Sequence, residues 1–337
     1  MNVTKGIDYK RAPENEDSEI HICFRCSDGY AIYAPVLIFS ILENNKNSYI
    51  YIYIFTDKIS DKRWENILSV AKTSSTCEVF KIHPTREDVM MMNDKSSAYH
   101  GWHLIHISIY YQKYLPQVKK VFNFGLDAYC VGDLRKIWLT QSGDAHYIGS
   151  SSRHQKARSR FSLSPIWIGF DASLLNLDAM RSDGVTPEAL ADYSIKTIGY
   201  IHDEVAHNGL CKKKFLDRKF YYIYCGSYLP KRRLDPDTVL IDFYNNLKAW
   251  DISVSGYEVF DRYIEYYSAV KDIIEIEYSL PKSFIEVSKS LKIRGYPFLD
   301  WYPISHPIIG EPIYRLCWTL KKLGNQLKVL CSSVYIK

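Results

Sequence analysis

Apolar and polar positions follow two different periods along the first half of the chain. Segments rich in apolar, β-branched and aromatic residues, typical of buried strands, occupy 19–28, 48–57, 77–84 and 119–124. Segments with apolar residues at helical spacing separate them, at 30–45, 59–75 and about 103–115, with Ser60 placed as the N-cap of the second. This order predicts an α/β, Rossmann-like fold, in which helices flank a mostly parallel sheet.

Three acids stand at or just beyond the carboxyl ends of predicted strands: Asp28, Asp57 and Asp127. Ligands bind at the carboxyl ends of the strands in open parallel sheets. A lone buried carboxylate costs on the order of several kcal/mol unless a metal, a basic side chain or a substrate hydroxyl meets it. We therefore expect Asp127, which ends an apolar strand, to lie at the ligand-facing edge of the sheet.

Composition narrows the class of protein. The 337 residues, 47% apolar and 24% charged, suffice for one large globular domain and a smaller appendage. The net charge of +5 comes without an aromatic-basic RNA motif, so we expect no nucleic-acid partner. No apolar run reaches the roughly 18–20 residues of a membrane span, and the polar N-terminus carries no signal-peptide pattern, which predicts a cytoplasmic protein. The glycine-rich motifs of dinucleotide-binding and P-loop proteins are missing from the sequence.

The run from Lys120 to Trp138 resembles the signature of family 8 glycosyltransferases, the group of lipopolysaccharide galactosyl- and glucosyltransferases. That signature is Lys-Val, two apolar or Tyr positions, Leu-Asp-x-Asp, four residues, Gly-Asp-Leu, three residues and Trp, and it aligns without a gap. Four further stretches resemble family motifs in the same order: CSDGYAIYAPVLIFSIL, ISIYYQKYLP, HDEVAHNGL and DFYNNLKAW. The resemblance implies a GT-A fold, a UDP-sugar donor, a divalent metal (Mn²⁺ or Mg²⁺) and retention of anomeric configuration.

The metal-binding positions depart from the family pattern. The first acid of the Asp-x-Asp motif is Gly125, and only the second remains, as Asp127. The family's metal-binding His is Asp242. Asp127 and Asp242 together offer two hard oxygen ligands, which suit Mg²⁺ or Mn²⁺. The alternative is that the metal is lost and that Lys248 neutralises the phosphates instead.

Glu204 takes the place of the Gln that lies beneath the sugar in the family, and Asp203 precedes it. The resemblance implies that Glu204 faces the anomeric carbon, as a stabilising charge or as a nucleophile, and that Asp203 binds sugar hydroxyls. The alternative for Glu204 is a surface charge on a short helix.

The resemblance also assigns the contacts to the donor. Asp28 and Tyr30 are expected to meet the uracil, although Asp28 alternatively serves only as a helix N-cap. The full set of donor-binding candidates is Asp28, Tyr30, Gln112, Asp127, Asp171, Asn245 and Lys248. Within it, Gln112 replaces an Arg of the family, and Asn245 replaces a Gly.

Three regions are expected: a polar extension at 1–18, the GT-A catalytic domain at 19–255 and a helical region at 256–337. The last region alternates leucines with basic and aromatic residues, namely Tyr314, Arg315, Trp318, Lys321, Lys322 and Lys328. Such a face suits an anionic membrane surface, and the alternative is an ordinary helix packed on the catalytic domain. We therefore expect a peripheral protein on the cytoplasmic face of the membrane.

These observations predict a glycosyltransferase that moves a hexose, galactose or glucose, from a UDP-sugar to a lipopolysaccharide, O-antigen or capsule glycan. The alternative is a non-catalytic nucleotide-sugar-binding or scaffold protein derived from such an enzyme. A nucleotidyltransferase ranks last, because CSDGYAIY lacks the glycine-rich basic loop that this class needs after its first strand.

Overall fold

The computed structural model describes residue Ile7 and residues 18–96, 102–150, 168–169, 172–224, 232–243, 248–253 and 255–281. The predicted extension up to residue 17 (apart from Ile7), the tail from residue 282, Asp171 and Asn245 lie outside them. By its contacts the chain divides into two compact units. The first takes its residues from Met1–Ile223, Asp235–Asp242 and Glu265–Tyr278, and the second from Tyr224–Leu234, Phe243–Ile264 and Ser279–Lys337.

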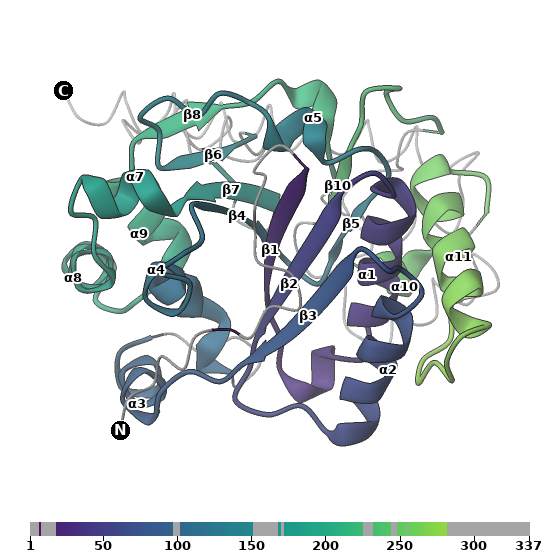
Figure 1. The fold of residues 1–337 in the computed structure, drawn as a ribbon, viewed down its shortest axis with the longest axis horizontal. Helices are drawn as coiled ribbons and strands as arrows, with labels where there is room; N and C mark the ends of the chain where they lie inside the picture. The colour runs from purple at the N-terminus through teal and green to yellow at the C-terminus, as the bar shows by residue number, and fades with distance from the viewer. Residues whose placement is uncertain are drawn as a thin grey trace, which may run out of the picture. The chain divides into compact units, whose positions relative to one another are not determined.

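A seven-stranded sheet forms the centre of the first unit, within the described part of the chain, in the order β3-β2-β1-β4-β7-β6-β8 (Figure 1). Its strands are β1 (Glu19–Arg25), β2 (Tyr49–Phe55), β3 (Cys77–Ile82), β4 (Lys120–Phe124), β6 (Tyr147–Gly149), β7 (Ala172–Asn176) and β8 (Lys213–Phe215). Strands β3, β2, β1 and β4 are parallel neighbours, whereas β7 runs antiparallel to β4 and β6. The four predicted strands and the mostly parallel sheet are confirmed.

A second, three-stranded sheet has the order β5-β10-β9. It is built from β5 (Ala128–Cys130), β10 (Leu240–Phe243) and β9 (Tyr221–Tyr224). β10 pairs antiparallel with β5, which follows β4 after a turn. The sheet therefore brings residues near 242 next to the end of the central strand β4.

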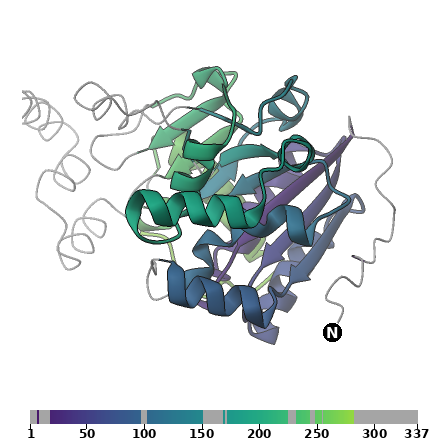
Figure 2. The same cartoon turned by 90° about the vertical axis from the view of Figure 1, so that its left-hand side faces the viewer.

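Helices are drawn on both sides of the central strands, with α1 and α2 on one side and α3, α4, α8 and α9 on the other (Figures 1 and 2). The α-helices are α1 (Ala34–Asn44), α2 (Asp61–Ala71), α3 (Arg86–Lys95), α4 (Tyr111–Tyr114), α5 (Arg135–Trp138), α7 (Leu177–Ser182), α8 (Pro187–Ile198), α9 (Asp203–Leu210), α10 (Ala249–Ile252) and α11 (Glu258–Lys271). Short 3₁₀ helices are η1 (Asp28–Tyr30), η2 (His103–Tyr110) and η3 (Arg218–Phe220). No described helix is long and apolar enough to cross a membrane.

Two helix boundaries differ from the sequence expectation. The segment expected as one helix at 103–115 is mostly the 3₁₀ helix η2, followed by the single turn of α4. Alternate isoleucines in η2 are β-branched, which weakens their preference for the α-helix. The helix expected from residue 30 begins at Ala34, where Pro35 occupies the first turn and fixes its start.

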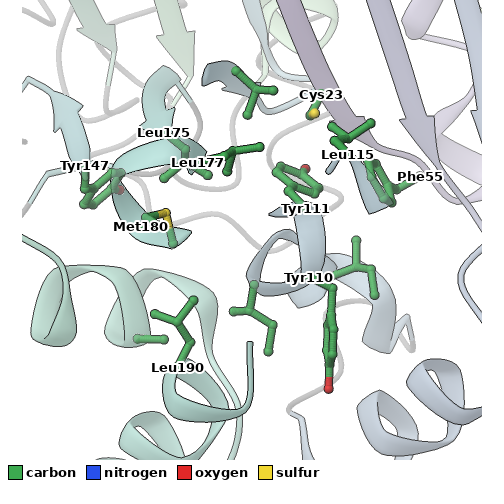
Figure 3. Close-up of a cluster of buried hydrophobic side chains, with 14 of the residues drawn as sticks. Cys23, Phe55, Tyr110, Tyr111, Leu115, Tyr147, Leu175, Leu177, Met180 and Leu190 are labelled. Carbon is green, nitrogen blue, oxygen red and sulfur yellow. The ribbon is translucent and has the colours of Figure 1, made fainter. Parts of the chain in front are cut away.

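Strand β2 shows how the sequence builds the core. Its sequence YIYIYIF places Tyr51, Tyr53 and Phe55 on one face and isoleucines on the other, and both sets are buried. The aromatic face packs in a cluster with Tyr111 and Leu115, and this cluster extends to β6, β7, α7 and α8 (Figure 3). Burial on both faces is what a central parallel strand requires.

Candidate active site

The predicted acids lie at one edge of the central sheet. Asp28, Asp57 and Asp127 follow the carboxyl ends of β1, β2 and β4, which are parallel neighbours. Phe24 of β1 pairs with Phe124 of β4, so these two strands end at the same level. Asp127 follows the carboxyl end of β4, and its contact with a ligand stays a prediction.

Asp127 and Asp242 are brought together by the pairing of β5 with β10. Asp127 is half-buried in the turn between β4 and β5, and the turn is closed by a 3.2 Å hydrogen bond from Ala128 N to Gly125 O. Asp242 is only 4% exposed and lies directly opposite Ala128 in the antiparallel ladder. Two acids from distant parts of the sequence thus occupy neighbouring backbone positions, and carboxylate oxygens are the type of ligand that hard divalent cations prefer.

Asp203, the first residue of α9, is the centre of a buried polar cluster. Its Oδ2 accepts hydrogen bonds from the guanidinium of Arg25 (2.5 Å) and from Ser108 Oγ (2.8 Å). Its Oδ1 lies 2.9 Å from His106 Nδ1 and accepts a 2.8 Å bond from the backbone N–H of Glu204. Burial raises the pKa of the Asp203 carboxyl, but the charges of Arg25 and His106 outweigh it and hold the pKa well below its ordinary value.

His202 completes a second group of candidate metal ligands. His106, His202 and Asp203 each offer one ligand atom, and these atoms lie within 4.8 Å of one another. Burial lowers the pKa of His202, which favours a neutral imidazole, and its ring lies 4.6 Å from that of His106. The donor types suit a divalent transition metal. Arg25 already neutralises the carboxylate, however, and its positive charge opposes a cation at the same oxygen atoms.

Helix α9 is anchored a second time through Asn208. Its side-chain amide binds both backbone groups of Ile168, with Oδ1 accepting from N at 2.8 Å and Nδ2 donating to O at 3.0 Å. Nδ2 also donates to Glu204 O at 3.0 Å. Asn208 was missing from the predicted site, although it occupies the Asn position of the HDEVAHNGL stretch.

Residues 21–253 match the sequence model described as Glycosyl transferase family 8. The chain belongs to this family. Membership supports a role in glycosyl transfer and confirms the resemblance found in the sequence.

Solved glycosyltransferases have a similar fold. The structure of the galactosyltransferase LgtC, in complex with donor and acceptor sugar analogues, is 16% identical with a TM-score of 0.60, and the match covers 76% of this chain and 98% of that one. The bifunctional glycosyltransferase WbbM is 13% identical with a TM-score of 0.59, covering 81% and 52%. GlyE of Streptococcus pneumoniae TIGR4 is 13% identical with a TM-score of 0.54, covering 83% and 65%. No curated protein matches the chain by sequence. These likenesses confirm the expected GT-A fold.

In this family 8 chain, Asp28 joins the end of β1 to the start of α2. Its carboxylate accepts from Ser60 N (2.8 Å) at the start of α2 and from Arg63 (2.7 Å), which also pairs with Glu277. The bond from the backbone of Ser60 is the main cause that lowers the pKa of Asp28. Tyr30 is half-buried, with its ring 5.9 Å from that of Tyr33. Uracil binding by Asp28 and Tyr30 stays a prediction.

Gln112 bonds to the backbone of the segment between α7 and α8. It is 7% exposed, and its Nε2 donates to Val185 O at 2.6 Å. From the same helical segment, Ser108 is the residue that reaches Asp203. A donor contact by Gln112 remains a prediction.

In the second unit, Lys248 precedes α10. It is 7% exposed, and its Nζ donates to Phe243 O at 3.0 Å. Its role toward phosphate is likewise a prediction.

Proposed function

We propose that this family 8 glycosyltransferase transfers a hexose, galactose or glucose, from a UDP-sugar to a lipopolysaccharide, O-antigen or capsule glycan, with retention of configuration. The observation that carries the proposal is the convergence at the edge formed by β1 and β4. There Asp127 and Asp242 occupy neighbouring positions, and Arg25, the last residue of β1, holds the helix that bears Glu204.

Asp127 and Asp242 are the residues that would hold Mg²⁺ or Mn²⁺, and a bound ion would neutralise the charge that develops on the leaving UDP. Glu204 supplies a carboxylate for the face of the sugar beneath the anomeric carbon. A carboxylate there stabilises an oxocarbenium-like transition state or forms a covalent glycosyl intermediate. The family resemblance supports base contacts by Asp28 and Tyr30, and further donor contacts by Gln112, Asp171, Asn245 and Lys248.

The proposal for the acceptor and for the location of the enzyme is based on the sequence of the tail beyond residue 281. Its basic and aromatic residues would hold the protein on the cytoplasmic face of the membrane, where lipid-linked glycans are its acceptors.

A second candidate function is nucleotide-sugar binding without transfer. The replacement of the first motif acid by Gly125 favours it, because one expected metal ligand is missing.

The test measures UDP release from UDP-galactose and UDP-glucose, with Mg²⁺ or Mn²⁺ present. We expect turnover that falls on the order of a hundredfold or more in Asp127→Asn, because lost stabilisation of the leaving group is typically worth about 2.7–4 kcal/mol. Asp57→Asn is the matched control, since Asp57 also ends a strand of the same sheet but is exposed and bonded to Trp102. Binding of UDP-hexose without any turnover would support the second candidate, and equal turnover in both variants would remove Asp127 from the site.

A further inference from the structure

We infer that Asp203 does not bind the sugar, and that Arg25, His106 and Ser108 act through it as positioning residues for Glu204. The inference rests on the proposed function for the role of Glu204. It differs from the role in sugar binding that the family resemblance implies for Asp203, because the Asp203 carboxylate already accepts hydrogen bonds from protein groups.

The Asp203 carboxylate is buried and accepts from three fixed donors, and His106 adds a fourth when its proton is on Nδ1; in the other tautomer, Nδ1 instead accepts from the Asp203 N–H at 3.4 Å. An ionised carboxylate offers about four acceptor sites on its two oxygens. Here Oδ2 accepts from Arg25 and Ser108, while Oδ1 accepts from the N–H of Glu204 and from His106 in the tautomer protonated at Nδ1. The side chain is also only 4% exposed, so a sugar would have to displace one of these donors.

The donors to Asp203 come from separate elements of the fold. Arg25 is the last residue of β1, and its guanidinium also donates to Ile105 O at 2.8 Å, which ties β1 to η2. His106 and Ser108 both lie on η2. The carboxylate therefore joins the start of α9 to the end of the central strand and to η2.

Glu204 is the residue that this arrangement fixes. Its N–H binds Asp203 Oδ1, and its C=O accepts from Asn208, which is itself bound to Ile168. Both polar groups of its backbone are held, while its side chain is half-buried. A misplacement of about 1 Å in a reacting group can cost on the order of a hundredfold in rate. Loss of one donor to Asp203 should thus lower turnover without altering affinity for the donor sugar.

Ser108→Ala removes one donor with a small change in volume. We expect kcat for UDP-hexose to fall about tenfold, while KM changes less than about twofold. The affinity for UDP-hexose relative to that for UDP, which reports contacts to the sugar, should also change less than about twofold. The matched control is Ser40→Ala, because Ser40 is also fully buried and bonded to backbone groups, at Leu37 O and Cys130 N, but belongs to α1. A selective loss of UDP-hexose affinity in Ser108→Ala would show that the cluster binds the sugar and would overturn the inference.

Amide hydrogen exchange separates this inference from the proposed function, because it needs no turnover. In Ser108→Ala we expect the Glu204 amide to exchange about tenfold faster, with no change in Ser40→Ala. Unchanged exchange at Glu204 would overturn the positioning role even in an active enzyme. A wild-type protein without UDP release, but with the expected exchange pattern, would refute the proposed function and leave the anchoring of α9 standing.

Discussion

Removing Arg25 should destabilise the fold far more than removing a surface charge. In Arg25→Met the Asp203 carboxylate stays buried and keeps its hydrogen bonds from Ser108 and Glu204. It loses the ion pair with the Arg25 guanidinium. Breaking one partner of a buried pair costs about 3–5 kcal/mol, because the other charge is left uncompensated. The double variant Arg25→Met/Asp203→Asn buries no lone carboxylate and should lose less than Arg25→Met alone.

Urea denaturation at pH 7 measures these free energies of unfolding. The matched control is Lys46→Met, which removes the exposed pair of Lys46 with Glu43, an interaction worth at most about 1 kcal/mol. Equal losses in Arg25→Met and Lys46→Met would refute the reasoning. The reasoning would also be refuted if Arg25→Met/Asp203→Asn lost as much stability as Arg25→Met and Asp203→Asn together, because residues in direct contact should not act additively.

The same carboxylate predicts the response to acid. Its pKa is lower in the folded state than the ordinary value of about 3.9, so its stabilising contribution is complete above that value. The contribution is lost as the pH falls below about 4 toward the folded-state pKa. Wild-type stability should therefore fall more steeply in this range than that of Asp203→Asn, and parallel curves would contradict the depressed pKa.

The remaining predictions concern the second anchor, the metal and the tail. Asn208→Ala should lower the free energy of unfolding by about 1–3 kcal/mol, because it leaves the buried N–H of Ile168 without its acceptor, while the Ile168 carbonyl still accepts from the Tyr147 hydroxyl; a loss below 1 kcal/mol in urea would contradict this. Asp242→Ala should abolish metal-dependent UDP release, whereas Gly125→Asp should retain it; equal rates in both would exclude Asp242 as a ligand. Mg²⁺ should serve nearly as well as Mn²⁺, because oxygen-only ligation does not favour the later transition metals, and a strict Mn²⁺ requirement would contradict this. Removing the residues after Ile309 should end sedimentation with anionic vesicles but keep UDP binding; equal sedimentation of both forms would end the membrane proposal.

The parallel half of the central sheet, β1 to β4, was predictable because each of these four strands carries its own local signal, whereas β6, β7 and β8 were not predicted. β2 alternates aromatic and aliphatic residues over its whole length, and β1 and β4 are buried strands rich in apolar residues, each followed within three residues by an acid. The resemblance to the family signature then predicted which motifs contribute to the site, including Asp127 and Asp242. The approach of Asp242 to Asp127 follows from that resemblance, and the β5–β10 pairing provides it.

The Asp203 cluster was not predictable in the same way. Its members are separated by 178, 97 and 95 residues from Asp203, for Arg25, His106 and Ser108 respectively. No local period connects such positions. The available signal was Arg25 itself, since a charged residue inside a buried strand requires a partner of opposite charge. The sequence did not identify which of the many acids that partner would be.

The central claim is that carboxylates at the edge of β1 and β4 support metal-dependent transfer from a UDP-sugar. The most direct measurement is UDP release from UDP-galactose and UDP-glucose by the full chain, first in excess EDTA and then after Mg²⁺ is restored. Asp127 and Asp242 as ligands predict that activity disappears in EDTA and returns with the ion. Full activity in EDTA would contradict the metal scheme and would assign the neutralisation of phosphate to Lys248.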